Sequence, residues 1–381
     1  MKVGFFSPLP PSRSGVADYA AALLADLKRH GQVEAGAKRC DIALYHLGNN
    51  ALHAGIYRQA MERPGVVVLH DAVLHHFFLG QLSEAAYLNE FAYNYGEWSR
   101  GLARDLWHGR AASGSDERYF RYPMLKRIGE RSLAVVVHNP AAARAVSEHA
   151  PEARVREIPH LAFSPANRPS GVDVIRYRET LGVPAGTLVF AVFGYLRESK
   201  RLISVLEAFA NLHRQYPQTA LLVAGEFVST DLARAVEPML SAPGVLRLPF
   251  LEERDFQLAA GAADVCINLR HPSAGESSGI AVRLMELGKP VLVTESEEYA
   301  RVPDGACIRI PAGPSERDSL LQHMVMLTAF GGVAGAVGER AAAHIQQSHR
   351  LELVSERYWD VLREARAMIL SEHQGGLSTH G

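Results

Sequence analysis

Short apolar segments alternate with longer helical segments along most of this chain, and this alternation constrains the fold more than any other feature. The apolar segments carry Val, Ile and Leu at successive positions, which is typical of strands buried on both faces of a parallel sheet. They lie at residues 3–6, 41–46, 65–70, 134–139, 188–194, 220–225, 245–250, 265–269, 291–293 and 306–310. Strands that alternate with helices predict βαβ units, and hence an α/β fold with doubly wound parallel sheets.

The alternation is interrupted by a segment rich in Pro and polar residues at 156–173. Such a segment predicts an interdomain linker, and a chain of 381 residues has a suitable length for two domains. We therefore predict two Rossmann-like α/β domains, over residues 1–165 and 172–350, with a cleft between them. A last helix is expected over residues 352–370, and the polar tail over 371–381 is expected to be disordered.

Composition and charge narrow the class of protein. With 48% apolar and 21% charged residues the chain is an ordinary globular protein, and its net charge of −1 argues against a nucleic-acid-binding protein. No apolar run reaches the roughly 18 residues of a membrane-spanning helix, and the N-terminus enters a strand at once instead of forming a signal peptide. Cys40, Cys266 and Cys307 are widely spaced, which is typical of reduced thiols. We expect a cytoplasmic protein.

One βαβ unit of the second domain contains the residues that most suggest a ligand site. Its first strand, at 265–269, leads into a loop, and a helix is expected from Ser278 to Leu287. The unpaired N–H groups at the start of that helix favour an anion, above all a phosphate. Glu276 lies beside this anion site, where its carboxylate would accept hydrogen bonds from the hydroxyls of a sugar. The alternative role of Glu276 is to cap the helix or to lie in its first turn.

Several strands of the first domain end in histidine. His46, His70 and His138 each follow an apolar run, and the carboxyl ends of parallel strands form the ligand crevice of an open α/β sheet. This pattern is a hint of function, although a strand-end histidine satisfied by the backbone is an equal alternative. Asn49 and Asp71 lie in the loops that follow two of these strands. The spacing of the histidines after His70 matches no common zinc pattern, so we predict no metal site there.

The first strand is followed by a proline-rich loop and by a helix that begins near Val16. This strand–loop–helix unit lacks the Gly-x-Gly-x-x-Gly pattern of dinucleotide-binding domains. A Rossmann dehydrogenase is therefore disfavoured.

Several of these segments, taken in order, resemble the family 4 glycosyltransferases, which have the GT-B fold of two Rossmann-like domains facing a cleft. The resemblance covers nearly the whole chain, and its specificity comes from the order of the segments, since each alone would be weak. The matching segments are Ser7–Pro11, Ser14–Tyr19, Phe193–Arg197 with Lys200, Ala262–Val265, Pro272–Ser273 and Gly288–Val291.

This resemblance implies the transfer of a sugar, with retention of its anomeric configuration, from a nucleotide-diphosphate sugar of the UDP or GDP type. The acceptor would be a hydroxyl of a glycan, of a lipid-linked sugar or of a small molecule. The family binds the nucleotide sugar in the C-terminal domain and the acceptor in the N-terminal domain, to which the last helix crosses back. It also implies a front-face path in which the departing phosphate oxygen takes the acceptor's proton, since no general base is evident in the sequence.

The sequence departs from the family at one motif. The usual block is Glu-Gly-Phe-Gly-x-x-x-x-Glu. When the two sequences are aligned at Gly288, Arg283 occupies the position of the second glutamate. Glu276 lies one residue nearer to Gly288 than the position of the first glutamate. The chain instead resembles a sub-branch with Gly-Glu-Ser/Thr-Ser-Gly and a following Arg. The usual second carboxylate can accept hydrogen bonds from two ribose hydroxyls, whereas arginine only donates. Arg283 is therefore expected to contact the ribose or a phosphate of the donor, or to pair with Glu286.

Two cations complete the predicted donor site. Arg197 and Lys200 follow a strand end, where they would stabilise the negative charge of a departing nucleoside diphosphate; an exposed basic loop is the alternative. These cations and the helix N–H groups would replace a divalent metal, and no Asp-x-Asp occurs, so we predict that no metal or other cofactor is needed. Further candidates for donor contacts are Gly15, for which a simple turn is the alternative role, and Gly194, Ser277, Ser278 and Gly279.

In the first domain, His70 is the best candidate to contact the donor sugar near its anomeric centre. Asp71, Asn49 and Trp98 are candidates on the acceptor side. The aromatic stretch over residues 91–127 would form an acceptor site or a membrane-surface patch, which would place the enzyme peripherally on the inner face of a membrane. The alternative for this stretch is ordinary helix packing.

Two other functions remain open. One is a different GT-B enzyme, such as a sugar-nucleotide epimerase or a phosphorylase-like protein. The other is a non-catalytic protein that binds sugar nucleotides, against which the presence of Arg197, Lys200 and Glu276 argues. No nucleic-acid partner is expected.

Overall fold

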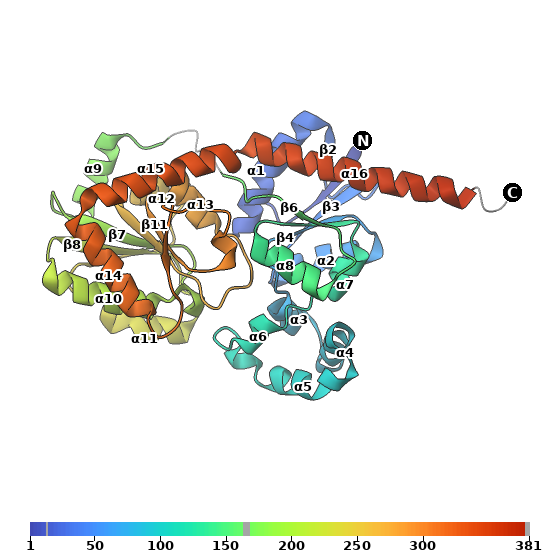
Figure 1. Cartoon of the computed structure of the whole chain (residues 1–381), viewed down its shortest axis with the longest axis horizontal. Helices are drawn as coiled ribbons and strands as arrows, with labels where there is room; N and C mark the ends of the chain where they lie inside the picture. The colour runs from blue at the N-terminus through green and yellow to red at the C-terminus, as the bar shows by residue number, and fades with distance from the viewer. Residues whose placement is uncertain (13, 163–167, 378–381) are drawn as a thin grey trace. The chain divides into compact units, whose positions relative to one another are not determined.

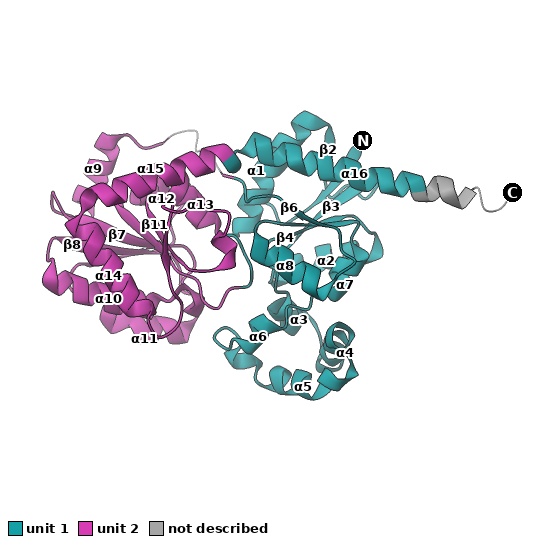
Figure 2. Cartoon of the chain, viewed as in Figure 1, with its two compact units in different colours: residues 1–161, 274–277, 348–381 teal, residues 162–273, 278–347 magenta. Residues whose placement is uncertain are grey.

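The computed structural model describes residues 1–12, 14–162 and 168–377, so part of the predicted linker and the end of the predicted tail lie outside the described residues. The chain divides into two compact units (Figures 1 and 2). Unit 1 comprises residues 1–161, 274–277 and 348–381, and unit 2 comprises residues 162–273 and 278–347. The boundary therefore falls at Leu161, and the loop over 274–277 groups with unit 1, which the sequence did not suggest.

Within the described residues, unit 1 is built on a six-stranded sheet in the order β2-β1-β3-β4-β5-β6. Every pairing in the sheet is parallel. The strands are β1 (Lys2–Phe6), β2 (Gln32–Ala35), β3 (Ile42–Leu47), β4 (Val66–Leu69), β5 (Ala134–Val137) and β6 (Val155–Glu157). The strand order reverses between β1 and β3, which is the place where open α/β sheets bind ligands.

The helices of unit 1 cover this sheet and extend one end of it (Figure 1). Their bounds are α1 (Gly15–His30), α2 (Ala54–Glu62), α3 (His75–Gln81), α4 (Glu84–Tyr95), α5 (Arg100–His108), α6 (Arg118–Arg121), α7 (Lys126–Arg131), α8 (Pro140–His149) and α16 (Leu351–Leu377), with short 3-10 turns η1 (Ala51–His53), η2 (Glu97–Ser99) and η3 (Arg110–Ala112). The last helix, α16, continues to Leu377, past the predicted end at residue 370. Helical structure thus replaces the disorder expected for the first part of the tail.

Helix α16 packs against α1 within unit 1. The hydroxyl oxygens of Tyr19 and Tyr358, which come from these two helices, lie 2.8 Å apart in a buried hydrogen bond. Gly31, which follows α1, lies so close to Trp359 that an added Cβ would meet the indole ring at 2.6 Å. Residues from the two ends of the chain therefore form one core.

Within the described residues, unit 2 is built on a second six-stranded sheet, in the order β12-β11-β10-β7-β8-β9 and again parallel throughout. Its strands are β7 (Leu188–Phe193), β8 (Thr219–Ala224), β9 (Val245–Leu248), β10 (Val265–Asn268), β11 (Val291–Thr294) and β12 (Ile308–Ile310). The order reverses between β7 and β10, so the carboxyl ends of these two strands mark the expected ligand position of unit 2.

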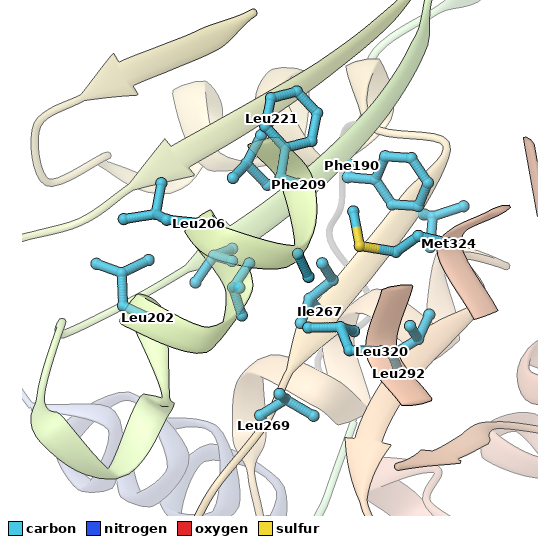
Figure 3. Packing of buried hydrophobic residues seen from close by; sticks show 14 of the residues in the cluster. Phe190, Leu202, Leu206, Phe209, Leu221, Ile267, Leu269, Leu292, Leu320 and Met324 are labelled. Atoms are coloured by element: carbon cyan, nitrogen blue, oxygen red, sulfur yellow. The ribbon is translucent and has the colours of Figure 1, made fainter. Parts of the chain in front are cut away.

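Helices pack on both faces of this sheet. They are α9 (Gly171–Thr180), α10 (Leu202–Gln215), α11 (Thr230–Leu240), α12 (Glu253–Ala262), α13 (Gly279–Glu286), α14 (Glu316–Ala329) and α15 (Gly331–Ser348), with η4 (Glu198–Lys200) and η5 (Glu297–Tyr299). Figure 3 shows the core on one face, where Leu202, Leu206 and Phe209 of α10 face the sheet. These positions are spaced by four and three residues, which places them on one side of a helix.

Among the described residues, no single helix has the length and apolar composition needed to cross a membrane. One pair of consecutive helical segments, Glu316–Ala329 and Gly331–Ser371, meets that test by length and composition when taken together, and the pair is bent by 105°.

Candidate functional site

Lys200 occupies the reversal point of the sheet in unit 2. It ends the short turn η4 that follows β7, and its side chain is buried. Its Nζ donates to the carbonyl oxygen of Phe193 at 2.8 Å and to Oδ1 of Asn268 at 3.2 Å. These residues end β7 and β10, the two strands between which the order reverses. A cation is thus fixed at the edge where ligands of this architecture bind.

The start of α13 reaches the same asparagine. Ser278 is the N-cap of α13: its Oγ accepts from the N–H of Ala281 at 3.3 Å and donates to Asn268 Oδ1 at 3.3 Å. One amide oxygen therefore connects the buried ammonium of Lys200 with the positive end of a helix dipole. Both groups favour a negative ligand. Sequence reasoning missed Asn268, although a polar residue at the end of the apolar run over 265–269 was a detectable signal.

Gly194, the residue after β7, lies beside these groups. Its φ of +94° is one that side chains rarely adopt. A Cβ added at this position would lie 3.6 Å from Cγ1 of Ile280 and 3.7 Å from Nζ of Lys200. Gly194 and the first turn of α13 therefore border Lys200, whereas Arg197, at the N-cap of η4, is exposed.

Arg283 pairs with Glu253 rather than with Glu286. Its Nη2 lies 2.6 Å and 2.7 Å from the two carboxylate oxygens of Glu253, at the start of α12, and its guanidinium stacks on Phe256 at 4.0 Å from the ring centroid. Glu286 is instead buried, with Arg168 at 3.7 Å from its carboxylate. Arg283 thus forms an ion pair between helices rather than along its own helix.

The loop residues that group with unit 1 have contacts of their own. Asn139 caps α8 with its Oδ1, and its Nδ2 donates to the carbonyl oxygen of Gly275 at 2.9 Å and to Oγ of Ser277 at 3.0 Å. The carboxylate of Glu276 accepts from the N–H of Ala274 at 2.7 Å. Because Ser278 caps α13 and the first turn of α13 contains no acidic residue, the capping role considered for Glu276 is wrong.

Four strands of unit 1 bring histidines together around Tyr19 of α1. His46 lies in β3, and His70, His138 and His160 follow β4, β5 and β6. The ring centroids of His70, His138 and His160 lie 4.9 Å, 5.3 Å and 4.8 Å from the Tyr19 ring, and His46 Nδ1 lies 3.0 Å from His70 Nε2. We call His46, His70, His138 and His160 the histidine cluster. His160 was missed because it lies in the predicted linker, which begins within the sheet at β6.

Burial keeps the histidine cluster neutral. Burial lowers the pKa of His138 to about 4 and that of His160 to about 3. It lowers the pKa values of His46 and His70 well below the usual range. Neighbouring histidines add to the effect for His160, His46 and His70. Nδ1–H of His138 donates to the carbonyl oxygen of Ile158 at 3.0 Å, which leaves its Nε2 as a hydrogen-bond acceptor. This nitrogen is buried, and none of the described residues bonds to it.

The described residues include no group of three or more His, Cys, Asp or Glu side chains arranged to hold a metal ion. Two of the histidines after His70 have evident structural partners. His75 Nε2 lies 2.7 Å from the hydroxyl of Tyr87, and His76 Nε2 lies 3.0 Å from the carbonyl oxygen of Ser113.

Asn49 and Asp71 connect the loops after β3 and β4. Asp71 Oδ2 accepts from the N–H of Asn49 at 2.7 Å, and Asn49 Oδ1 accepts from the N–H of Phe77 at 2.8 Å. Asn49 Nδ2 also lies 3.1 Å from Nδ1 of His76. Both candidates therefore hold these loops against the start of α3.

The last two candidates lie at the surface of unit 1. Trp98, in η2, is 76% exposed, whereas Phe91 and Tyr119 of the same aromatic stretch are buried in helix packing. Gly15 begins α1 directly after its N-cap Ser14, and no described atom lies within 4 Å of a Cβ added there.

A scan against models of protein families found no match for this sequence, and a search of curated proteins found none. Solved structures do match. A sucrose-phosphate synthase from Thermosynechococcus elongatus aligns over 96% of this chain and 99% of its own, with a TM-score of 0.67 at 14% identity. HepE from Anabaena, solved with UDP and glucose, aligns over 96% of this chain and 100% of its own, with a TM-score of 0.64 at 15% identity.

A third match is WaaG, a glycosyltransferase involved in lipopolysaccharide biosynthesis, which aligns over 94% of this chain and 99% of its own with a TM-score of 0.63 at 16% identity. At such identities the likeness concerns the fold. Together with the two parallel sheets, it confirms the predicted pair of Rossmann-like domains.

Proposed function

On the premise that this chain has the GT-B fold of two Rossmann-like domains, we propose that it is a retaining glycosyltransferase. It transfers a sugar from a nucleoside-diphosphate sugar of the UDP or GDP type to a hydroxyl of a glycan, a lipid-linked sugar or a small molecule. The observation that carries this proposal is the buried ammonium of Lys200 held next to the start of α13 at the reversal point of unit 2. Matches of the same fold solved with UDP or UDP-glucose support the class of donor.

The chemistry follows from charge. When the bond between the sugar and the diphosphate breaks, negative charge grows on the phosphate oxygens. Lys200, Arg197 and the N–H groups of Ser278 and Gly279 stabilise this charge in the transition state. Because Asn268 and Phe193 already hold the ammonium in place, little reorganisation is needed during the reaction. These groups supply the charge stabilisation that a divalent metal would otherwise provide, and the reaction is proposed to need none.

His70 and Glu276 contact the sugar in this proposal. The neutral imidazole of His70 can exchange hydrogen bonds with a sugar hydroxyl without adding a charge near the anomeric centre. The carboxylate of Glu276 accepts hydrogen bonds from other hydroxyls. The acceptor's proton passes to the departing phosphate oxygen, so no separate base is required. Exposed Trp98 is proposed to contact a glycan or lipid-linked acceptor, which would make the protein peripheral to a membrane.

The first test is nucleotide binding measured by thermal shift. UDP or GDP is expected to raise the melting temperature of the wild-type chain, and Arg197→Ala and Lys200→Met are expected to abolish the rise. Arg234→Ala is the matched control, because Arg234 is an exposed cation of unit 2 on α11. A wild-type chain that responds to no nucleoside diphosphate would refute the proposal.

Product analysis tests the reaction itself. Proton NMR of the product should show the same anomeric configuration as the donor, and turnover should persist in EDTA. Conversion of the nucleotide sugar to an epimer without any acceptor would identify an epimerase instead.

A further inference from the structure

The ion pair between Arg283 and Glu253 presents a carboxylate beside the proposed donor site. Arg283 lies one turn after Gly279, and residues four apart lie on the same face of a helix. Its guanidinium crosses to α12, where one nitrogen contacts both oxygens of Glu253 at 2.6 Å and 2.7 Å. The helix that carries the anion-favouring N-terminus therefore holds an acidic side chain from its neighbour.

This carboxylate is held firmly and remains accessible. Phe256 supports the guanidinium at 4.0 Å, and Gln257 donates its Nε2–H to Glu253 Oε1 at 2.7 Å. The Glu253 side chain is 61% exposed, whereas that of Arg283 is 20% exposed. A carboxylate has about four acceptor sites, more than these two donor nitrogens occupy. It can accept further hydrogen bonds from a ligand without changing its conformation.

A short chain of contacts connects Glu253 with Lys200. The ring of Phe256, one turn after Glu253, packs edge-on against Phe193 with the centroids 5.3 Å apart. The carbonyl oxygen of Phe193 is the one that accepts from Lys200 Nζ at 2.8 Å. These two phenylalanines thus connect Lys200 with Glu253. We place the phosphates of the ligand at Lys200 and its next group along α13, towards Glu253.

The chemistry of the pair selects the group that binds there. Phosphate is disfavoured beside the exposed carboxylate of Glu253, which only accepts hydrogen bonds. Two neighbouring hydroxyls suit this carboxylate, because each hydroxyl can donate to one of its two oxygens. In a nucleoside diphosphate these are the 2′ and 3′ hydroxyls of the ribose, which is joined to the diphosphate through its 5′ oxygen.

We propose that Glu253 binds the ribose hydroxyls of the donor nucleotide and that Arg283 is a positioning residue that holds the carboxylate of Glu253 in place. The carboxylate that the resemblance implies at position 283, to bind the ribose hydroxyls, is in this proposal supplied by Glu253 of α12. This inference rests on the proposed use of a nucleotide sugar, and it adds the residue that distinguishes ribose from deoxyribose.

The experiment compares UDP and GDP with their 2′,3′-dideoxy analogues by isothermal titration. The wild-type chain should bind the ribonucleotide about tenfold to a hundredfold more tightly than the dideoxy analogue, the range for hydrogen bonds to a charged group. In Glu253→Gln and Glu253→Ala this preference should fall to about twofold or less. Affinity for the dideoxy analogue should hardly change, because the lost contacts are those to the hydroxyls.

Asp255→Asn is the matched control, since it removes the same charge from an exposed position two residues further along α12. It should keep the preference for ribose. Arg283→Lys should retain part of this preference, because an ammonium can replace the single nitrogen that contacts Glu253, whereas Arg283→Met should lose it. A purely structural role of Arg283 would weaken both ligands equally.

Two failures are distinguishable. If the wild-type chain binds neither nucleotide, the proposed function fails. If it binds one and Glu253→Ala keeps the full preference for ribose, the assignment of Glu253 is overturned while the proposed function stands. Equal weakening of both ligands by Arg283→Met would show that Arg283 does not act through Glu253 and would overturn its assignment as a positioning residue.

Discussion

The carboxyl edges of the two sheets carry polar residues of opposite kinds. In unit 2, the edge holds the ammonium of Lys200 and the start of α13, both joined to Asn268. In unit 1, the edge holds the histidine cluster, whose members are buried and neutral. The same architecture is thus specialised at one edge for an anion and at the other for hydrogen bonding without charge. In the proposed reaction, the edge of unit 2 contacts the donor phosphates and His70 at the edge of unit 1 contacts the donor sugar.

The largest effect is expected at Lys200. Lys200→Met keeps most of the length of the side chain but removes the charge that faces the leaving group in the proposed reaction, so kcat should fall by about 100-fold to 1,000-fold. Steady-state kinetics with the nucleotide sugar identified by binding measure this loss. Arg201→Met is the control, because Arg201 pairs with buried Glu316 with 2.8 Å between Nε and Oε1. It should lower the melting temperature and leave the kcat of the folded protein within a few fold of wild type; equal losses of kcat would remove the distinction.

The histidine cluster is expected to make unit 1 sensitive to acid. In the unfolded chain a histidine titrates near pH 6.5, whereas His138 in the folded chain titrates near 4, so protons bind preferentially to the unfolded state between these values. The resulting stability is fully present above about pH 6.5 and is lost as the pH falls towards 4. At pH 5 the loss from His138 alone is about 2 kcal/mol.

Urea unfolding of the wild-type chain and of His138→Gln at pH 7.5 and pH 5 measures this effect. The variant should lose part of the pH dependence while remaining less stable at pH 7.5. An identical pH dependence in the two proteins would show that His138 is not protonated on unfolding.

The tyrosine pair beside the cluster should show a coupled effect of similar size. Tyr19→Phe or Tyr358→Phe leaves one buried hydroxyl without its partner, at a cost of about 1–3 kcal/mol. The double substitution should cost less than the sum of the two, because both polar groups are removed together. A double-mutant cycle from urea unfolding measures the coupling, and strictly additive costs would contradict the hydrogen bond.

The smallest effects distinguish the glycines of the two edges. Gly194→Ala should destabilise unit 2 by about 1–2 kcal/mol, because φ at this position is +94°. Gly15→Ala should change stability by less than about 0.5 kcal/mol, since the added methyl group meets no described atom within 4 Å. Any loss of activity in Gly15→Ala then reports close approach of a ligand. A large loss of stability instead would point to a structural role.

The sequence predicted most strands because buried parallel strands are continuous apolar runs. It missed β2, whose residues are mostly exposed at the edge of the sheet, and β6, whose polar residues resembled a linker. Lys200 and the start of α13 were identified because the residues nearby in sequence define them. The partner of Arg283 was not identified from the sequence, because Glu253 lies 30 positions away on a different helix and only packing brings the two residues together.

The hydrogen bond between Tyr19 and Tyr358 joins residues separated by 339 positions. During translation, unit 2 therefore emerges from the ribosome before α16 is available to cover α1. At about 5–20 residues per second, the early strands wait roughly 20–70 seconds for this helix. For that time the residues of α1 that pack against α16 remain exposed to solvent. The half of the protein that is made first is thus completed last.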